Sequence, residues 1–152
     1  MRAPARQIVA SGPFDDVRSR DLRFLQEASR LGELSVLLWP DDLVEKVSGS
    51  APIFPLAERD YFLRAVRFVS RVLILENSAR SDALPPGLRA DIWADSGPAA
   101  NRERQEFCRD NGLQYRAFSP DELKRFPMPP PAPSAPGEKK VVVTGSFDWF
   151  HS

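Results

Sequence analysis

The residues of this 152-residue chain that most suggest chemistry follow an apolar run near the N-terminus. Residues 7–11 lead into Gly12, and the cations Arg18 and Arg20 come shortly afterwards, where a helix is expected to begin. A helix N-terminus offers unpaired N–H groups and a positive dipole end to anions, so this turn predicts a phosphate site. The alternative is that both arginines are solvated surface charges, offset by nearby carboxylates (Asp15, Asp16 and Asp21).

A second copy of the same pattern stands in residues 141–152. Three valines are followed by Gly145, then by Phe147 and Asp148, and then by His151, the only histidine of the chain. A lone histidine is usually an ordinary surface or core residue. Its place in a repeated strand–turn pattern instead makes it a candidate functional residue. The repeat predicts a tandem pair of related domains, of which only the second keeps a histidine.

The elements that must position the first turn alternate between strand and helix. Apolar runs predict strands at 7–11, 34–39, 71–75, 91–94 and 114–118, and longer periodic segments predict helices at 20–31, 55–69 and 101–111. Strands that are apolar on both faces and alternate with helices are typical of a parallel sheet covered on both sides. The expected fold is therefore α/β, with a Rossmann-like sheet of about five strands. Such sheets bind ligands beyond the carboxyl ends of their strands, which is where Gly12 falls.

Two local patterns predict where helices begin and end and which of their residues face solvent. In residues 20–31 one face is apolar (Leu22, Leu25, Ala28 and Leu31) and the opposite face is polar (Arg23, Gln26, Glu27 and Arg30). We therefore expect Arg23 and Gln26 to face solvent, and Gly32 to stop the helix. Ser119 followed by Glu122 predicts the capped start of a further helix.

The turn itself resembles the motif of the cytidylyltransferase-like nucleotidyltransferases. In that family the first strand runs into Gly-Thr-Phe-Asp and then into His-x-Gly-His at the start of the first helix, where this chain has Gly12-Pro13-Phe14-Asp15 followed by residues 18–21. The similarity extends over about residues 7–118, and residues 41–69 are similar to the heptose-phosphate adenylyltransferase and glycerol-phosphate cytidylyltransferase branch. It implies a nucleotidyltransferase-like fold and attack of a phosphomonoester on CTP or ATP, with release of pyrophosphate.

The resemblance also implies site residues. These are His151 as a catalytic residue and, as nucleotide-binding residues, Gly12, Phe14, Asp15, Lys46, Arg59, Gly145, Phe147 and Asp148. In the family the histidines donate to phosphate oxygens as charge builds on the α-phosphorus, and Mg²⁺ neutralises the pyrophosphate that leaves. The implied partners are CTP or ATP with Mg²⁺ and a sugar- or alcohol-phosphate; no metal ligands are expected in the protein itself.

The first copy departs from the motif at the positions that matter for catalysis. Arg18 stands at the first histidine, Arg20 at the glycine and Asp21 at the second histidine. A carboxylate there would repel the phosphates that a histidine holds. We therefore expect residues 1–152 to show no nucleotidyl transfer and the second domain of the parent protein to transfer CMP or AMP. The alternative role for the first domain is an inactive nucleotide-binding, dimerisation or regulatory module, in which a homodimer is also expected.

Composition and charge set the remaining limits. Lys+Arg and Asp+Glu both number 21, so no overall field attracts nucleic acid or a membrane. The single Cys108 excludes an internal disulfide and fits a reducing, cytoplasmic location. Proline dominates residues 127–138, which predicts an extended linker. The expected division is a degenerate domain at 1–126, the linker at 127–138, and at 139–152 the truncated first strand and turn of a second domain, either disordered or paired with a sheet edge.

Overall fold

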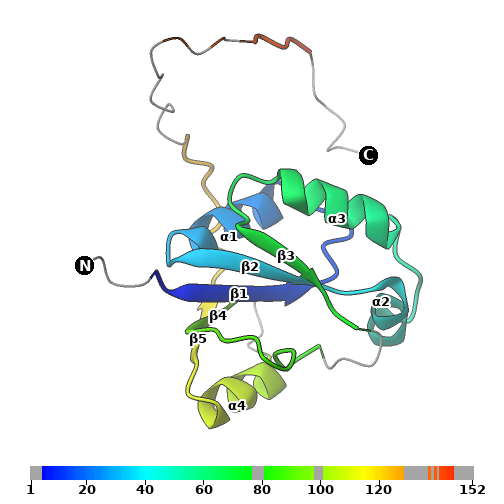
Figure 1. The fold of residues 1–152 in the computed structure, drawn as a ribbon, viewed down its shortest axis with the longest axis vertical. Coiled ribbons are helices and arrows are strands. Elements are labelled where there is room, and N and C mark those ends of the chain that lie inside the picture. The colour runs from blue at the N-terminus through cyan, green and yellow to red at the C-terminus, as the bar shows by residue number, and fades with distance from the viewer. Residues whose placement is uncertain are drawn as a thin grey trace.

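One parallel sheet organises the chain (Figure 1). The computed structural model describes residues 5–76, 81–97, 101–128, 137, 139 and 141–145. Its strands are β1 (Gln7–Gly12), β2 (Glu33–Leu38), β3 (Arg71–Ile74), β4 (Ile92–Ser96) and β5 (Gln114–Phe118), in the order β3-β2-β1-β4-β5. Every pairing between neighbours in this order is parallel. The predicted α/β sheet is therefore confirmed, with β1 at its centre.

Helices cover both faces of the sheet. They are α1 (Ser19–Ser29), α2 (Asp41–Ser48), α3 (Leu56–Ala65) and α4 (Arg102–Asp110). Successive residues of β1 point to opposite faces, so Ile8 packs in one core cluster with residues of α1 and α3, and Val9 packs in the other with residues of α2 and α4. Both β1 residues are fully or almost fully buried. This double burial explains why the strand reads as a continuous apolar run.

Helix α2 is an element that the sequence did not predict. No element was predicted for residues 41–46, because only Leu43 and Val44 of the helix's eight residues are buried, too few to show a helical period. Pro40 precedes the helix, and Asp41 and Asp42 occupy the first turn, where carboxylates favour the dipole. The following helix is shorter than expected, since α3 ends at Ala65 rather than near residue 69.

The polar face of α1 was also predicted wrongly. Arg23 and Gln26 are only 8% exposed, because the segment after β5 packs across the helix. Arg23 Nε donates to the Arg125 carbonyl at 2.6 Å. That segment is a turn and not the expected helix, although Ser119 and Glu122 do exchange the bonds of a capping box. Hydrogen bonds from Arg116 and Ser119 lower the pKa of Glu122 to about 2.

The C-terminal segment lies outside the sheet. Residues 141–145 belong to no helix or strand, and Val141, Val142 and Val143 are 86%, 83% and 71% exposed. No edge pairing of these five residues is found, and the division of the chain into two domains stays a prediction. No helix in the described part of the chain is long and apolar enough to cross a membrane.

Candidate functional site

The candidate site lies where the sheet changes its winding direction. The chain moves outward from β1 through β2 to β3, and then returns to the other side of β1 to form β4 and β5. Ligands bind open α/β sheets at this point, beyond the carboxyl ends of the two central strands. A crevice of about 410 Å³ opens there, and Gly12, Phe14, Asp15 and Asp21 all line it. The predicted location of Gly12 at the carboxyl edge is confirmed.

The turn after β1 contains a strained residue. Phe14 has a φ of 46°, in the left-handed region that residues with side chains rarely adopt. This conformation costs about 1 kcal/mol and persists only where neighbouring contacts maintain it. The Phe14 ring packs on the Gly12 backbone, since a Cβ at position 12 would lie 3.4 Å from Phe14 Cε2.

Asp15 is bonded to the loop that follows α2. Its carboxylate accepts hydrogen bonds from the backbone N–H of Ile53 at 2.7 Å and from that of Phe54 at 2.8 Å. Each carboxylate oxygen takes one of these bonds. The side chain therefore ties two segments of backbone together at the mouth of the crevice.

Arg59 lies behind the same turn. Its guanidinium donates to the carbonyl oxygens of Pro13 at 2.6 Å, Trp39 at 2.9 Å and Phe54 at 2.9 Å, and it pairs with the Asp41 carboxylate. The side chain is 1% exposed. Arg59 is thus a buried residue held by protein groups, with its charge directed away from solvent.

The motif positions on α1 are engaged with their own neighbours. Arg18 Nε donates to Asp16 at 2.8 Å, and this hydrogen bond and the carboxylate's charge raise the pKa of Arg18. The Asp21 carboxylate accepts the backbone N–H of Arg18 at 2.9 Å, which closes the N-terminus of the helix. Arg20 is exposed and does not line the crevice. The backbone N–H of the N-cap residue is therefore already occupied.

The other residues implied by the resemblance lie elsewhere. Lys46, in the last turn of α2, is exposed and is not part of the crevice lining. Gly145 is exposed in the C-terminal segment. Phe147, Asp148 and His151 lie outside the described residues.

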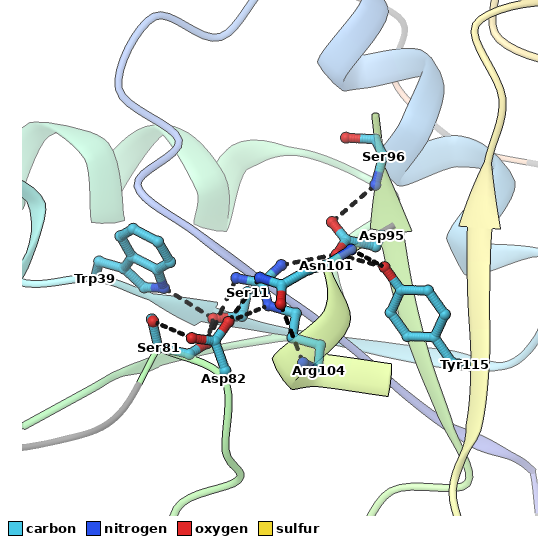
Figure 2. Close-up of polar contacts among 9 residues, drawn as sticks. All are labelled: Ser11, Trp39, Ser81, Asp82, Asp95, Ser96, Asn101, Arg104 and Tyr115. Carbon is cyan, nitrogen blue, oxygen red and sulfur yellow. Dashed lines mark hydrogen bonds and ion pairs between the residues drawn. The ribbon is translucent and has the colours of Figure 1, made fainter. Parts of the chain in front are cut away.

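A polar cluster that the sequence did not reveal forms the opposite wall (Figure 2). Arg104 on α4 donates to Asp82 at 3.0 Å and to Asp95 at 3.0 Å, and its side chain is 7% exposed. Asp95 also accepts the Tyr115 hydroxyl at 3.0 Å, and Asp82 accepts the Asn101 amide at 2.8 Å. Burial and the charge of Asp95 raise the pKa of Tyr115 to about 12. One buried cation thus joins the crossover before β4, the end of β4 and the start of α4.

The same cluster reaches the end of β1. Trp39 Nε1 donates to Ser11 Oγ at 2.8 Å, and Ser11 Oγ donates to the Ser81 carbonyl at 3.3 Å. The Ser81 carbonyl also accepts from Arg104 Nη2 at 3.4 Å. Figure 2 shows these bonds as one continuous set between Trp39 and Tyr115. Both walls of the crevice are therefore held by a buried arginine.

Negative charge dominates the crevice. Its lining contains the carboxylates of Asp15, Asp16, Asp21 and Asp95, and Arg104 is the only cation among the lining residues. Arg104 divides its charge between two carboxylates, and the bonds to Asp15 and Asp21 come from neutral backbone N–H groups. Across the described ranges, no three His, Cys, Asp or Glu side chains converge as metal ligands. We assign no step in this part of the chain to the Mg²⁺ that the resemblance implies.

Cys108 is unsuited to act as a nucleophile. It is 1% exposed on the inner face of α4, and burial raises the pKa of its thiol to about 11. The thiolate is the reactive form, so both its access and its population are low.

Comparison with known proteins relates the chain to enzymes. No family model matches it. It is 37% identical to the FAD synthase of Pyrococcus abyssi over 116 residues, which cover 74% of this chain and 78% of that protein. It is 31% identical to the bifunctional protein HldE of Streptomyces coelicolor over 101 residues, which cover 65% of this chain and 22% of that protein. Two other FAD synthases, from Pyrococcus horikoshii and Thermococcus sibiricus, are matched over 60% and 64% of their length.

A solved structure supports the fold independently. The crystal structure of the lipopolysaccharide core biosynthesis protein from Thermoplasma volcanium superposes with a TM-score of 0.59 at 19% identity, covering 76% of this chain and 96% of that one. At this identity the likeness concerns the fold alone. The FAD synthase match covers most of both proteins. The chain belongs to the cytidylyltransferase-like family of nucleotidyltransferases.

Proposed function

We propose that residues 7–118 keep the fold of a nucleotidyltransferase without its chemistry, and that nucleotidyl transfer depends on the second copy of the motif, which contains His151. The observation that supports this is the bond of 2.9 Å between the Asp21 carboxylate and the Arg18 N–H. It engages the N-cap N–H with a carboxylate that stands at the position where the family resemblance implies a histidine donor. A carboxylate about 4 Å from a phosphate oxygen opposes the charge of the transition state by on the order of a few kcal/mol.

The reaction proposed for the second copy is transfer of CMP or AMP from CTP or ATP, with Mg²⁺, to a sugar- or alcohol-phosphate. An oxygen of the phosphomonoester forms a bond to the α-phosphorus, while the bond from that phosphorus to the leaving pyrophosphate breaks. His151 would donate to the α-phosphate oxygens as their charge rises. The relatives named FAD synthase support this class, because FAD is itself a nucleotide-linked product. A cytoplasmic location, where both nucleotides occur, is part of the proposal.

The test is pyrophosphate release by the 152-residue chain with CTP or ATP, Mg²⁺ and a panel of phosphomonoesters. We expect no release above the protein-free blank. Each lost preorganised donor typically costs a hundredfold or more in rate, and Asp21 adds repulsion to the two losses. A triple variant (Arg18→His, Arg20→Gly and Asp21→His) restores the motif and is expected to release more pyrophosphate than the natural chain.

The variant His151→Ala separates the two copies of the motif. Release by the natural chain would contradict the expectation of no release, and its loss in His151→Ala would then assign it to the second copy. Release that survives in His151→Ala and is lost in Gly12→Arg would place the chemistry in the first copy and contradict the proposal. Gly12 suits this purpose because it lines the crevice beside the motif turn.

A second candidate function is a nucleotide-binding, dimerisation or regulatory module. The observation that favours binding is the crevice of about 410 Å³ beyond the carboxyl ends of the central strands. It stays open although the Asp21 carboxylate is bonded to the N–H of Arg18. Because the lining is acidic, we expect Asp21→Asn to bind ATP several-fold more tightly than the natural chain. Isothermal titration calorimetry of both proteins, each also sedimented to find its oligomeric state, measures this. Equal affinities would exclude Asp21 as the group that limits binding.

A further inference from the structure

The turn that carries Phe14 is held on both sides. Before it, the Pro13 carbonyl accepts Arg59 Nη1 at 2.6 Å, and after it, the Asp15 carboxylate accepts both N–H groups of residues 53–54 at 2.7 and 2.8 Å. Phe14, with its φ of 46°, lies between these fixed points. A strained, non-glycine residue persists where several independent contacts fix its conformation. These contacts meet that condition.

Arg59 extends the same connection to three other segments. It donates to the carbonyl of Trp39, after β2, and to that of Phe54, before α3, at 2.9 Å each. It also pairs with Asp41 in the first turn of α2, and that carboxylate accepts the Leu56 N–H at 3.4 Å. One guanidinium, 1% exposed, thus joins the ends of β1 and β2 to the starts of α2 and α3.

We propose that Asp15 and Arg59 form a latch, which holds residues 49–55 against the turn at 12–15 and keeps Phe14 in its strained conformation in place of contacting a nucleotide. Both oxygens of Asp15 and four hydrogen bonds of Arg59 are directed at protein groups. A guanidinium has five N–H donors, so little of its capacity is left for a ligand. The latch makes the shape of the crevice mouth a property of the fold, and it holds whether the domain is active or inactive.

Amide hydrogen exchange followed by NMR tests the latch at its two reporter groups, the N–H groups of Ile53 and Phe54. Asp15→Asn keeps the side-chain shape but exchanges one acceptor oxygen for a donor, so we expect faster exchange of one of the two amides. Asp15→Ala removes both acceptors and should speed both. A hydrogen bond to a charged group corresponds to roughly a ten- to hundredfold change in exchange.

The Phe14 conformation provides a second readout. A positive φ brings the residue's amide and α protons close together, which gives a strong cross-peak between them. We expect Arg59→Met to weaken this cross-peak and Arg59→Lys to restore part of it, since lysine can reach one of the acceptors but not all of them. The matched control is Arg64→Met on the same helix, whose exposed side chain pairs with Asp60 at 2.9 Å. It should leave Phe14, Ile53 and Phe54 unchanged.

Nucleotide addition separates a latch from a ligand site. With ATP or CTP and Mg²⁺ added to the natural chain, exchange at Ile53 and Phe54 and the Arg59 Nε resonance should stay as they were. A change in either would show that Asp15 or Arg59 contacts nucleotide and would overturn the proposal. Unaltered exchange at both amides in Asp15→Ala would overturn it too. These readouts do not depend on pyrophosphate release, so they can fail while the proposed function stands.

Discussion

An Arg104→Met variant is expected to lose about 3 to 5 kcal/mol of unfolding free energy, because removing one partner of a buried ion pair leaves the other charge uncompensated. Methionine replaces most of the aliphatic stem. However, the carboxylates of Asp82 and Asp95, at 14% and 20% side-chain exposure, then lose the cation with which both are paired. The contact of the guanidinium with the Trp93 ring, at 5.5 Å, is lost as well. Urea denaturation followed by circular dichroism measures the change.

Two further variants make this result specific. Arg102→Met removes a neighbouring arginine of α4 whose side chain is 89% exposed, and it should change stability by less than about 0.5 kcal/mol. The double variant Arg104→Met with Asp82→Asn removes one stranded charge, so it should be more stable than Arg104→Met alone. Equal stability of Arg104→Met and Arg102→Met would show that the cluster in Figure 2 does not stabilise the domain.

Gly32→Ala is expected to lose about 3 kcal/mol, at the upper end of ordinary overpacking. A Cβ at position 32 would lie 2.2 Å from the carbonyl oxygen of Arg6 and 2.9 Å from its carbonyl carbon. That oxygen cannot turn away freely, because it accepts the Glu33 N–H at 2.8 Å as β1 and β2 begin to pair. The start of β1 must therefore shift, and thermal unfolding monitored by circular dichroism should show a clearly lower midpoint.

Gly49→Ala is the matched control for that variant. Gly49 has a φ of 80° at the end of α2, and a Cβ there would meet nothing within 4 Å. Alanine then suffers only the backbone strain of the left-handed region, about 1 kcal/mol. A Gly49→Ala variant less stable than Gly32→Ala would contradict the close approach at Arg6 as the dominant effect.

The strands could be predicted because burial on both faces makes them nearly continuous apolar runs. Residues 114–118 agree with β5 at both ends, and the other strands agree within about two residues. Helix α2 could not be found this way, because a short helix with two buried residues shows no period. The burial of Arg23 was missed for another reason: the segment that covers it lies about a hundred residues away in sequence.

The site was predictable in location but not in its contacts. A turn after the first strand of a parallel sheet must lie at its carboxyl edge, so the place of Gly12 followed from topology alone. The acceptors of Arg59 are mostly backbone carbonyls, which leave no trace in side-chain identity. Arg104 stood on a helix rich in charged residues, and its partners Asp82 and Asp95 lie 22 and 9 positions away. No local spacing distinguishes such an arginine from its solvated neighbours.

The walls of the crevice are held by the buried side chains of Arg59 and Arg104. Neither residue belongs to the exposed part of the motif turn. Exposed positions such as Arg18 and Arg20 can therefore change with effects on stability mostly within about 0.5 kcal/mol. This makes the domain a suitable framework for directed evolution, since a library limited to these exposed positions can be sorted for a new ligand without first being sorted for folding. If a gene for such a domain is duplicated, one copy can accumulate substitutions at the exposed turn positions and still fold stably.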